Sequence, residues 1–152
     1  MGAMAAKKTT HSKDGEAYLA RAIARYSPEV AEIAGAGLKK MRTRYPGARV
    51  MVYDRRQSLP IGFAPADGGA LFSIVLYPRW VRFFFLEGVA IEDPEKRLEG
   101  SGNQVRSIRL DKGAAVLDDP YIRGLMAEAV KDSGEDLKKG SGEVVLKSTM
   151  EV

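Results

Sequence analysis

The stretch LFSIVLYPRWVRFFFL, residues 71–86, contains two apolar runs separated by a proline–arginine pair. A two-residue turn at that pair predicts an antiparallel hairpin in which Phe72 lies opposite Phe85. Because successive side chains of a strand point to opposite faces, this pairing gives one face made only of apolar side chains. A shift of one residue would bring Arg82 onto that face, so the pattern also predicts the register of the hairpin.

Apolar residues at three- and four-residue spacing predict three helices. The first covers 16–26. The second begins at Ser27-Pro28, an N-cap followed by a first-turn proline, and ends at Tyr45-Pro46-Gly47. The third begins at 118–120 and stops at Ser133-Gly134.

Between the helices, the apolar residues alternate with a period of two. This alternation predicts five strands, which cover 49–53, 59–64, 70–77, 80–86 and 105–110. Short connections that contain proline and glycine favour a meander of neighbouring strands. We therefore expect an α+β fold. It is a two-layer sandwich of an antiparallel meander sheet of about five strands, with the N- and C-terminal helices on one face.

The 152 residues are enough for one domain. Residues 1–14 are expected to be a disordered leader, whose first six residues have the look of a cloning scar, and 15–133 a single α/β domain. Residues 134–152 begin with glycines, lysines and acids and are expected to be a flexible C-terminal tail. Within it, the apolar residues 144–146 fit a short strand or a docked tail, and the sequence leaves both open.

The side chains that most enzymes use are scarce in this chain. There is no cysteine and one histidine, His11, which excludes disulfides and cysteine-ligated metals and argues against a histidine base. We therefore expect a protein that is not an enzyme and holds no cofactor. No apolar run is long enough to span a membrane and no signal peptide follows the first lysines, so we expect no membrane partner and a cytoplasmic location.

The second face of the predicted sheet, away from the helices, carries rings and guanidinium groups instead of the usual polar side chains. Leaving one such ring in water forgoes roughly 1.5–3 kcal/mol of burial, so something is expected to cover this face. The candidates are the chain itself, through the loop 87–104 or the tail, a second copy of the protein, and a small ligand. The residues expected to bind a ligand are Tyr53, Tyr77, Trp80, Arg82, Phe84 and Arg109.

In this register Arg82 and Arg109 are neighbours on adjacent strands. Two like charges so placed are unfavourable unless an acid or a bound anion lies between them, and Glu87 and Glu99 are the nearby acids. The leading hypothesis is a non-catalytic binding protein that holds a small anionic or aromatic ligand on the outer sheet face. The alternative from the same residues is an interaction module that forms a homodimer through this face.

Two charged segments are candidates for binding other ligands. Segment 39–56 carries seven cations and one acid, a net charge of +6, and the pI is near 9.3. This charge permits contact with a phosphate backbone, but no recognition helix or stacking strand accompanies it, so nucleic acid is not the expected partner. The four acids within 92–99 offer oxygen ligands, yet Lys96 and Arg97 lie among them, and no metal site is predicted.

Residues 72–77 and 80–85, with Leu98-Glu99-Gly100-Ser101-Gly102 and 105–110, resemble the YdhG-like family of uncharacterised bacterial proteins. The resemblance covers roughly residues 16–133. It implies a frataxin-like fold, which agrees with the helix–sheet–helix order derived above. One branch of the family is thought to act as an intracellular iron chaperone, so the resemblance implies iron binding as a further alternative.

Two departures from the family bear on the iron hypothesis. Frataxin-type iron binding uses an acidic ridge along the first helix, whereas the corresponding segment here carries Lys39, Lys40, Arg42 and Arg44. Family members usually have an acidic tryptophan–glycine–methionine–proline stretch after the first helices, and residues 52–60 take its place here. A ligand specific to that stretch is therefore not implied for this chain.

Overall fold

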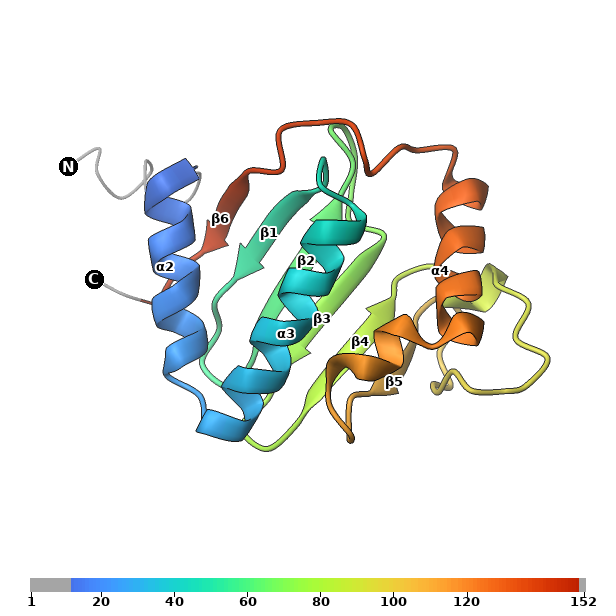
Figure 1. Ribbon diagram of the computed structural model, residues 1–152, viewed down its shortest axis with the longest axis horizontal. Helices are drawn as coiled ribbons and strands as arrows, with labels where there is room; N and C mark the ends of the chain where they lie inside the picture. Colours follow the sequence, from blue (N-terminus) through green and yellow to red (C-terminus); the bar gives the residue numbers. More distant parts are fainter. Residues whose placement is uncertain (1–11, 151–152) are drawn as a thin grey trace.

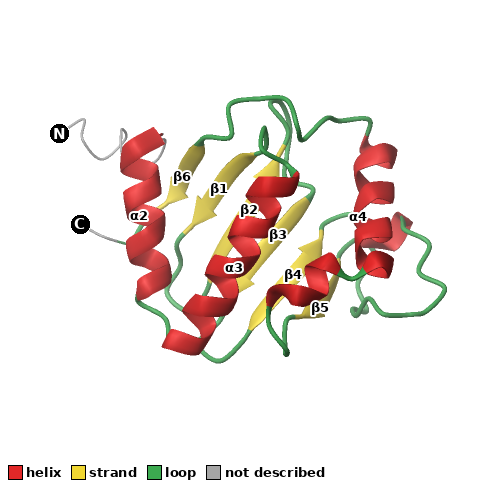
Figure 2. Ribbon diagram, viewed as in Figure 1, coloured by secondary structure: helices red, strands yellow, loops and turns green. Residues whose placement is uncertain are grey.

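Three helices and a six-stranded sheet form the part of the chain that the computed structural model describes, residues 12–150. Figures 1 and 2 show helices α2 and α3 crossing the same face of the sheet, and the predicted α+β class is confirmed. The helices are α2 (Ser12–Ala24), α3 (Pro28–Arg44) and α4 (Pro120–Ser133), with 3-10 turns η1 (Gly88–Ala90) and η2 (Ala114–Asp118). The strands are β1 (Arg49–Tyr53), β2 (Leu59–Ala64), β3 (Phe72–Leu76), β4 (Val81–Phe85), β5 (Arg106–Arg109) and β6 (Val144–Ser148).

The β3–β4 hairpin has the predicted register. Phe72 pairs with Phe85, and the next strand continues the pattern with Ile108 opposite Phe83. The rings of Phe83 and Phe85 are almost fully buried, at 0% and 1% exposure, whereas Arg82 between the apolar positions of β4 is only half-buried. The register therefore separates an apolar face from a mixed one, as the sequence pattern requires.

The sheet has one strand more than expected, and that strand makes it mixed. Strands β1 to β5 form the predicted antiparallel succession, and β6 pairs in parallel with β1 at the edge. The backbone N–H of Val50 donates to the Glu143 carbonyl at 2.8 Å, and that of Asp54 to the Ser148 carbonyl at 3.1 Å. The expectation of a purely antiparallel sheet is wrong at this edge, because β6 satisfies backbone groups of β1 that a five-stranded sheet would leave unpaired.

The chain ends also differ from the expected domain limits. Of the expected leader, residues 1–11 lie outside the described residues, and residues 12–14 form the first turn of α2. At the other end, residues 144–146 belong to strand β6, which is one of the two alternatives that the sequence leaves open. The sheet therefore extends past residue 133, where the domain was expected to end.

The segment between α4 and β6 packs against the end of α3. The Gly47 N–H donates to the Leu137 carbonyl at 3.0 Å, and Leu137 is 1% exposed. Gly140 has a φ of +134°, and a Cβ at this position would collide with the Gly47 carbonyl oxygen. Only glycine combines this backbone conformation with so close an approach, so the segment makes specific contacts where a flexible tail was expected.

The starts of α3 and α4 follow the predicted capping signals, whereas α2 begins four residues earlier and ends two residues earlier than the predicted 16–26. The Ser27 hydroxyl accepts a hydrogen bond from the Val30 N–H at 3.2 Å, with Pro28 in the first turn of α3. The Asp119 carboxylate caps α4 through the Tyr121 N–H at 2.9 Å. None of the helices within residues 12–150 is both long enough and apolar enough to cross a membrane.

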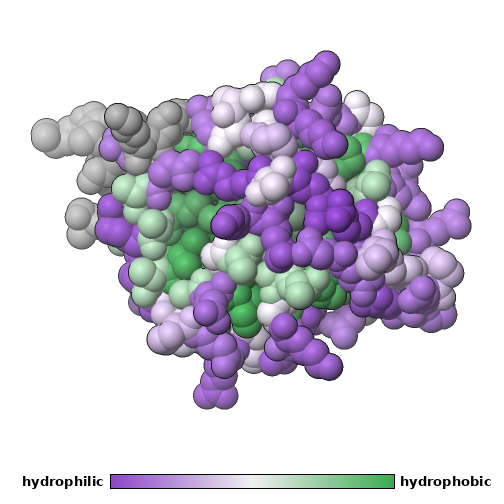
Figure 3. Space-filling view, in the orientation of Figure 1, coloured by the Kyte–Doolittle hydropathy of each residue, from purple (hydrophilic) through white to green (hydrophobic). Residues whose placement is uncertain are grey.

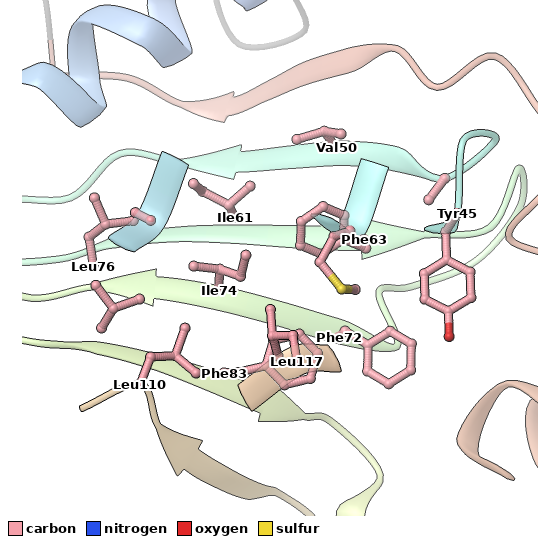
Figure 4. Packing of buried hydrophobic residues seen from close by; sticks show 14 of the residues in the cluster. Tyr45, Val50, Ile61, Phe63, Phe72, Ile74, Leu76, Phe83, Leu110 and Leu117 are labelled. Atoms are coloured by element: carbon pink, nitrogen blue, oxygen red, sulfur yellow. The ribbon is translucent and has the colours of Figure 1, made fainter. Parts of the chain in front are cut away.

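A cluster of aromatic rings joins the end of α3 to the middle of the sheet (Figure 4). The ring of Tyr45 stacks on Phe72 with centroids 5.8 Å apart, and Phe72 stacks on Phe83 at 5.6 Å. Phe83 and Phe85 meet edge to face at 5.3 Å. Each of these rings contributes roughly 1.5–3 kcal/mol through burial, so the cluster ties the helix layer to the hairpin.

Phe83→Ala is expected to lower the free energy of unfolding by about 3–5 kcal/mol, because it leaves a cavity under the helices. Phe84→Ala removes the same ring from the half-buried opposite face and is expected to cost clearly less. Urea denaturation followed by circular dichroism measures both. An equal loss in the two variants would contradict the face assignment.

Leu146→Ala tests whether β6 belongs to the folded unit. Leu146 is 4% exposed and lies in the main core, so the substitution is expected to cost about 2–5 kcal/mol. Its exposed neighbour Lys147 serves as the control, with a change within about 0.5 kcal/mol for Lys147→Ala. Denaturation curves of the Leu146 variant that overlay those of the unmodified protein would mean that β6 adds no stability.

Candidate functional site

The face of the sheet opposite α2 and α3, called the outer face below, carries the residues that the sequence singled out. In β4, Arg82 and Phe84 alternate with fully buried residues and are both half-buried. The register places Ser73 opposite Phe84 on one side and Ser107 on the other. Small polar residues next to a ring leave space above them, so this part of the face is concave.

The outer face contains a shallow hollow of about 420 Å³. Its floor and walls combine small residues, rings and one guanidinium group. We call it the outer-face hollow, and the residues that define it are Tyr53, Arg55, Gly62, Ala70, Ser73 and Phe84. The Arg55 guanidinium carbon lies 5.6 Å from the centroid of the Tyr53 ring, within cation–π distance.

Two of the six predicted ligand-binding residues, Tyr53 and Phe84, line this hollow. Three others form a separate stack. The rings of Tyr77 and Trp80 are 6.1 Å apart, and the Arg109 guanidinium lies 4.8 Å over the Trp80 ring. Trp80 therefore shares the outer side with Arg109, opposite to the buried Phe83, as predicted, but it lies outside the lining of the hollow.

The sixth predicted residue, Arg82, is paired with an acid of the chain. The register places it directly opposite Arg109, as expected. Of the two candidate acids, Glu99 is the one that binds Arg82, with an N–O distance of 2.6 Å, while Glu87 accepts a hydrogen bond from Gln104. Arg109 in turn pairs with Asp111, so both guanidinium groups are balanced without a bound anion.

The chain itself covers part of the outer face. The Arg49 side chain donates to the carbonyls of Pro65 and Gly68, at 2.9 and 2.7 Å, and so fixes the β2–β3 connection at one rim. At the opposite rim, Glu99 and Ser107 exchange two backbone hydrogen bonds of 2.7 and 2.8 Å.

The loop that forms the second rim is organised by Asp93. Its carboxylate accepts hydrogen bonds from the backbone N–H groups of Leu98, at 2.8 Å, and Arg97, at 3.1 Å, and from the Tyr121 hydroxyl. Burial pushes the pKa of Asp93 up, but the Tyr121 and backbone hydrogen bonds outweigh it and hold this pKa below its ordinary value. The loop acid thus serves the fold. Within residues 12–150, no three or more acids or histidines are grouped to hold a metal ion.

Sequence reasoning missed two charged residues that follow β1, Arg55 on the lining of the hollow and Asp54 on the helix side of the sheet. From the sequence, Arg55 was counted only as part of the basic segment 39–56. Arg55 follows Tyr53 by two positions, and side chains two positions apart in extended backbone point to the same face of a sheet. Asp54 is 2% exposed and is bound by the Tyr18 hydroxyl, at 2.6 Å, and by Arg25 of the turn after α2. The sequence does show Asp54 as a single acid directly after an apolar strand. Its burial could not be predicted from this, because its partners Tyr18 and Arg25 lie far from it in the sequence. The burial of this carboxylate fixes the turn that carries Arg55.

Comparisons of the chain with protein families, with curated proteins and with solved structures find no match. The resemblance to the YdhG-like family therefore stays a prediction that rests on the residues quoted for it.

Asp93→Asn is expected to make the stability of the protein depend less on pH at acid pH. Because the folded-state pKa of Asp93 is lowered, the carboxylate stabilises the fold above its unfolded pKa, and this contribution is lost as the pH falls below about 4. Thermal midpoints measured between about pH 7 and pH 2.5 should converge for the two proteins at the acid end. The exposed Asp67→Asn is the control, and a parallel profile for Asp93→Asn would contradict the assigned role.

Proposed function

We propose that this protein is a non-catalytic binding protein for a small aromatic molecule that carries a negative charge, held in the outer-face hollow. The observation that carries the proposal is the combination of two rings, Tyr53 and Phe84, with the Arg55 guanidinium around a floor of small residues. Tyr53 lies on β1 and Phe84 on β4, with β2 and β3 between them, so the ring of the ligand would lie across the floor of small residues and contact these side chains at its two ends. A carboxylate attached to the ring would be directed toward Arg55. Such a pairing of apolar walls with one placed charge is typical of small-ligand sites.

The size of the hollow supports a ligand of one or two rings. Its volume of about 420 Å³ lies at the lower end of the roughly 300–1,000 Å³ range of ligand sites. Gly62 and Ser73 keep the floor free, since a Cβ on Gly62 would lie 3.0 Å from the Ala70 Cβ. Larger side chains at these positions would fill the space that the ligand needs.

The absence of a proton-transfer pair supports binding rather than catalysis. Among the lining residues, all of which the structure describes, there is no carboxylate and no imidazole. The polar groups that remain are hydroxyls and one guanidinium. These groups donate hydrogen bonds to an anion well, but they are poor general bases at neutral pH.

Homodimerisation through the outer face and iron binding remain as the alternatives. The partly exposed Val105 at the rim, at 36%, adds apolar surface that a second copy would cover. Iron binding rests on the family resemblance. Light scattering that gives a dimer, dissociated by Phe84→Glu, would favour the first alternative over a ligand.

A titration with benzoate, indole-3-acetate and 4-hydroxybenzoate, followed by backbone amide shifts in NMR, tests the proposal. Benzamide is the neutral counterpart of benzoate. Arg55→Gln is expected to weaken carboxylate binding about tenfold and to leave benzamide unchanged, because it removes one charge-assisted hydrogen bond. Phe84→Ala is expected to weaken both, because it removes a wall of the site.

Arg56→Gln is the matched control for this experiment. Arg56 is the next residue in the chain and does not line the outer-face hollow. It lines a neighbouring hollow of about 390 Å³, to which Arg25 and Arg55 also contribute. Benzoate affinity should not change in this variant. The proposal fails if none of the three carboxylates binds saturably, or if Arg55→Gln and Phe84→Ala leave their affinities unaltered.

A further inference from the structure

A second hollow, on the helix side of the molecule, is lined mostly by cations. Its volume is about 690 Å³, and it lies between α3, the end of η2, the first turn of α4 and the segment that follows α4. Figure 3 shows hydrophilic side chains over the region between α3 and α4. We call it the basic hollow, and its charged lining residues are Lys39, Lys40, Arg44, Asp118, Arg123 and Lys138.

The single acid of this lining neutralises only part of its charge. Asp118 is bound by Lys40 and by Arg44, the latter with an N–O distance of 2.9 Å. Five cations against one carboxylate leave four positive charges around the hollow. The hydrogen bond from Lys40, with the charges of Arg44 and Arg123, lowers the pKa of Asp118, so this acid stays ionised and the count of charges holds at neutral pH.

The other three cations of the lining take part in no salt bridge of the described residues. Within residues 12–150, no salt bridge involves Lys39, Arg123 or Lys138. Clustered like charges repel one another, and the repulsion falls when an anion binds between them. The basic hollow therefore has charge available for a ligand.

The helix dipole accounts for some of these cations but not for all. Lys39 and Arg44 lie toward the C-terminal end of α3, where positive charge is favourable. Arg123, in contrast, is the fourth residue of α4, near the end of the helix where the dipole disfavours a cation. Lys138 lies outside any helix. The helix dipole therefore does not explain why Arg123 and Lys138 lie around this hollow.

Part of the lining is held in place before any ligand binds. The Arg44 side chain is 15% exposed, paired with Asp118, and its second terminal nitrogen lies 3.3 Å from the Met126 sulfur. A guanidinium group fixed in this way loses little conformational freedom when it binds an anion. Arg44 and Asp118 therefore give the hollow one wall that is in place before an anion binds.

We propose that the basic hollow binds a small anion that carries two or more phosphate groups. Guanidinium and ammonium groups both donate charge-assisted hydrogen bonds to phosphate oxygens. Because the cations come from separate segments around one concave space, a molecule with several phosphates contacts more of them than a single phosphate does. The volume of about 690 Å³ suits a compact molecule. This site is separate from the outer-face hollow and does not depend on its proposed ligand.

Calorimetric titration with pyrophosphate and inorganic triphosphate tests this inference. Arg123→Gln and Lys39→Gln are each expected to weaken binding about tenfold, because each removes one charge-assisted hydrogen bond. Arg79→Gln, an exposed cation of the β3–β4 turn outside the lining, is the control and should not change the affinity. Orthophosphate is expected to bind at least about tenfold more weakly than pyrophosphate.

Two further measurements separate the alternatives. Thermal unfolding checks that the variants fold, and both substituted positions are exposed on helices, so their midpoints should stay close to that of the unmodified protein. Duplex DNA and single-stranded RNA are titrated at the same salt concentration. The inference is overturned if neither polyphosphate binds saturably, if both variants bind like the unmodified protein, or if a nucleic acid binds about tenfold more tightly than pyrophosphate through Arg123 and Lys39.

Discussion

The alternation of side chains along β4 is the constraint on which the rest of the structure depends. The rings of Phe83 and Phe85 enter the aromatic cluster under α3 only if Arg82 and Phe84 point to the other side. A shift of the register by one residue would bury the Arg82 guanidinium among rings, at a high cost in free energy. The outer face, with its partly buried Phe84, is therefore a consequence of the core and exists before any ligand or partner is considered.

Most charges beside the sheet are neutralised within the chain. Glu99 binds Arg82, Asp111 binds Arg109, and the buried Asp54 is bound by a residue of the turn after α2. The outer-face hollow and the basic hollow both carry cations that form no salt bridge within residues 12–150, and they differ in character. The outer-face hollow is apolar with one guanidinium, which suits a ring with an acid group. The basic hollow is polar and cationic, which suits an anion with several charges.

The positions of the acidic residues matter for the hypothesis of iron binding, because a metal ion would need carboxylates as ligands. The loop acids that were considered as metal ligands include Asp93, which accepts hydrogen bonds from backbone and tyrosine groups, and Glu99, which pairs with Arg82. Helix α3, which the predicted family resemblance would match to the acidic helix of frataxin-type proteins, lines a cationic hollow. A metal would therefore compete with contacts that hold the fold, or bind beside like charge. An organic anion would neither compete for these carboxylates nor be repelled by the cations.

The sequence by itself determined the local elements and one register. The period-two runs marked strands β1 and β2 to the residue, Ser27 and Asp119 marked the starts of two helices, and Arg82 ruled out a slipped hairpin. These signals lie within a few residues of the structure that they specify. Only the tertiary structure decided the parallel pairing of β6, the burial of Asp54, and the meeting of cations from α3, α4 and the following segment. Each of these features joins segments that are distant along the chain, so it depends on how whole elements pack and not on the spacing of neighbouring residues.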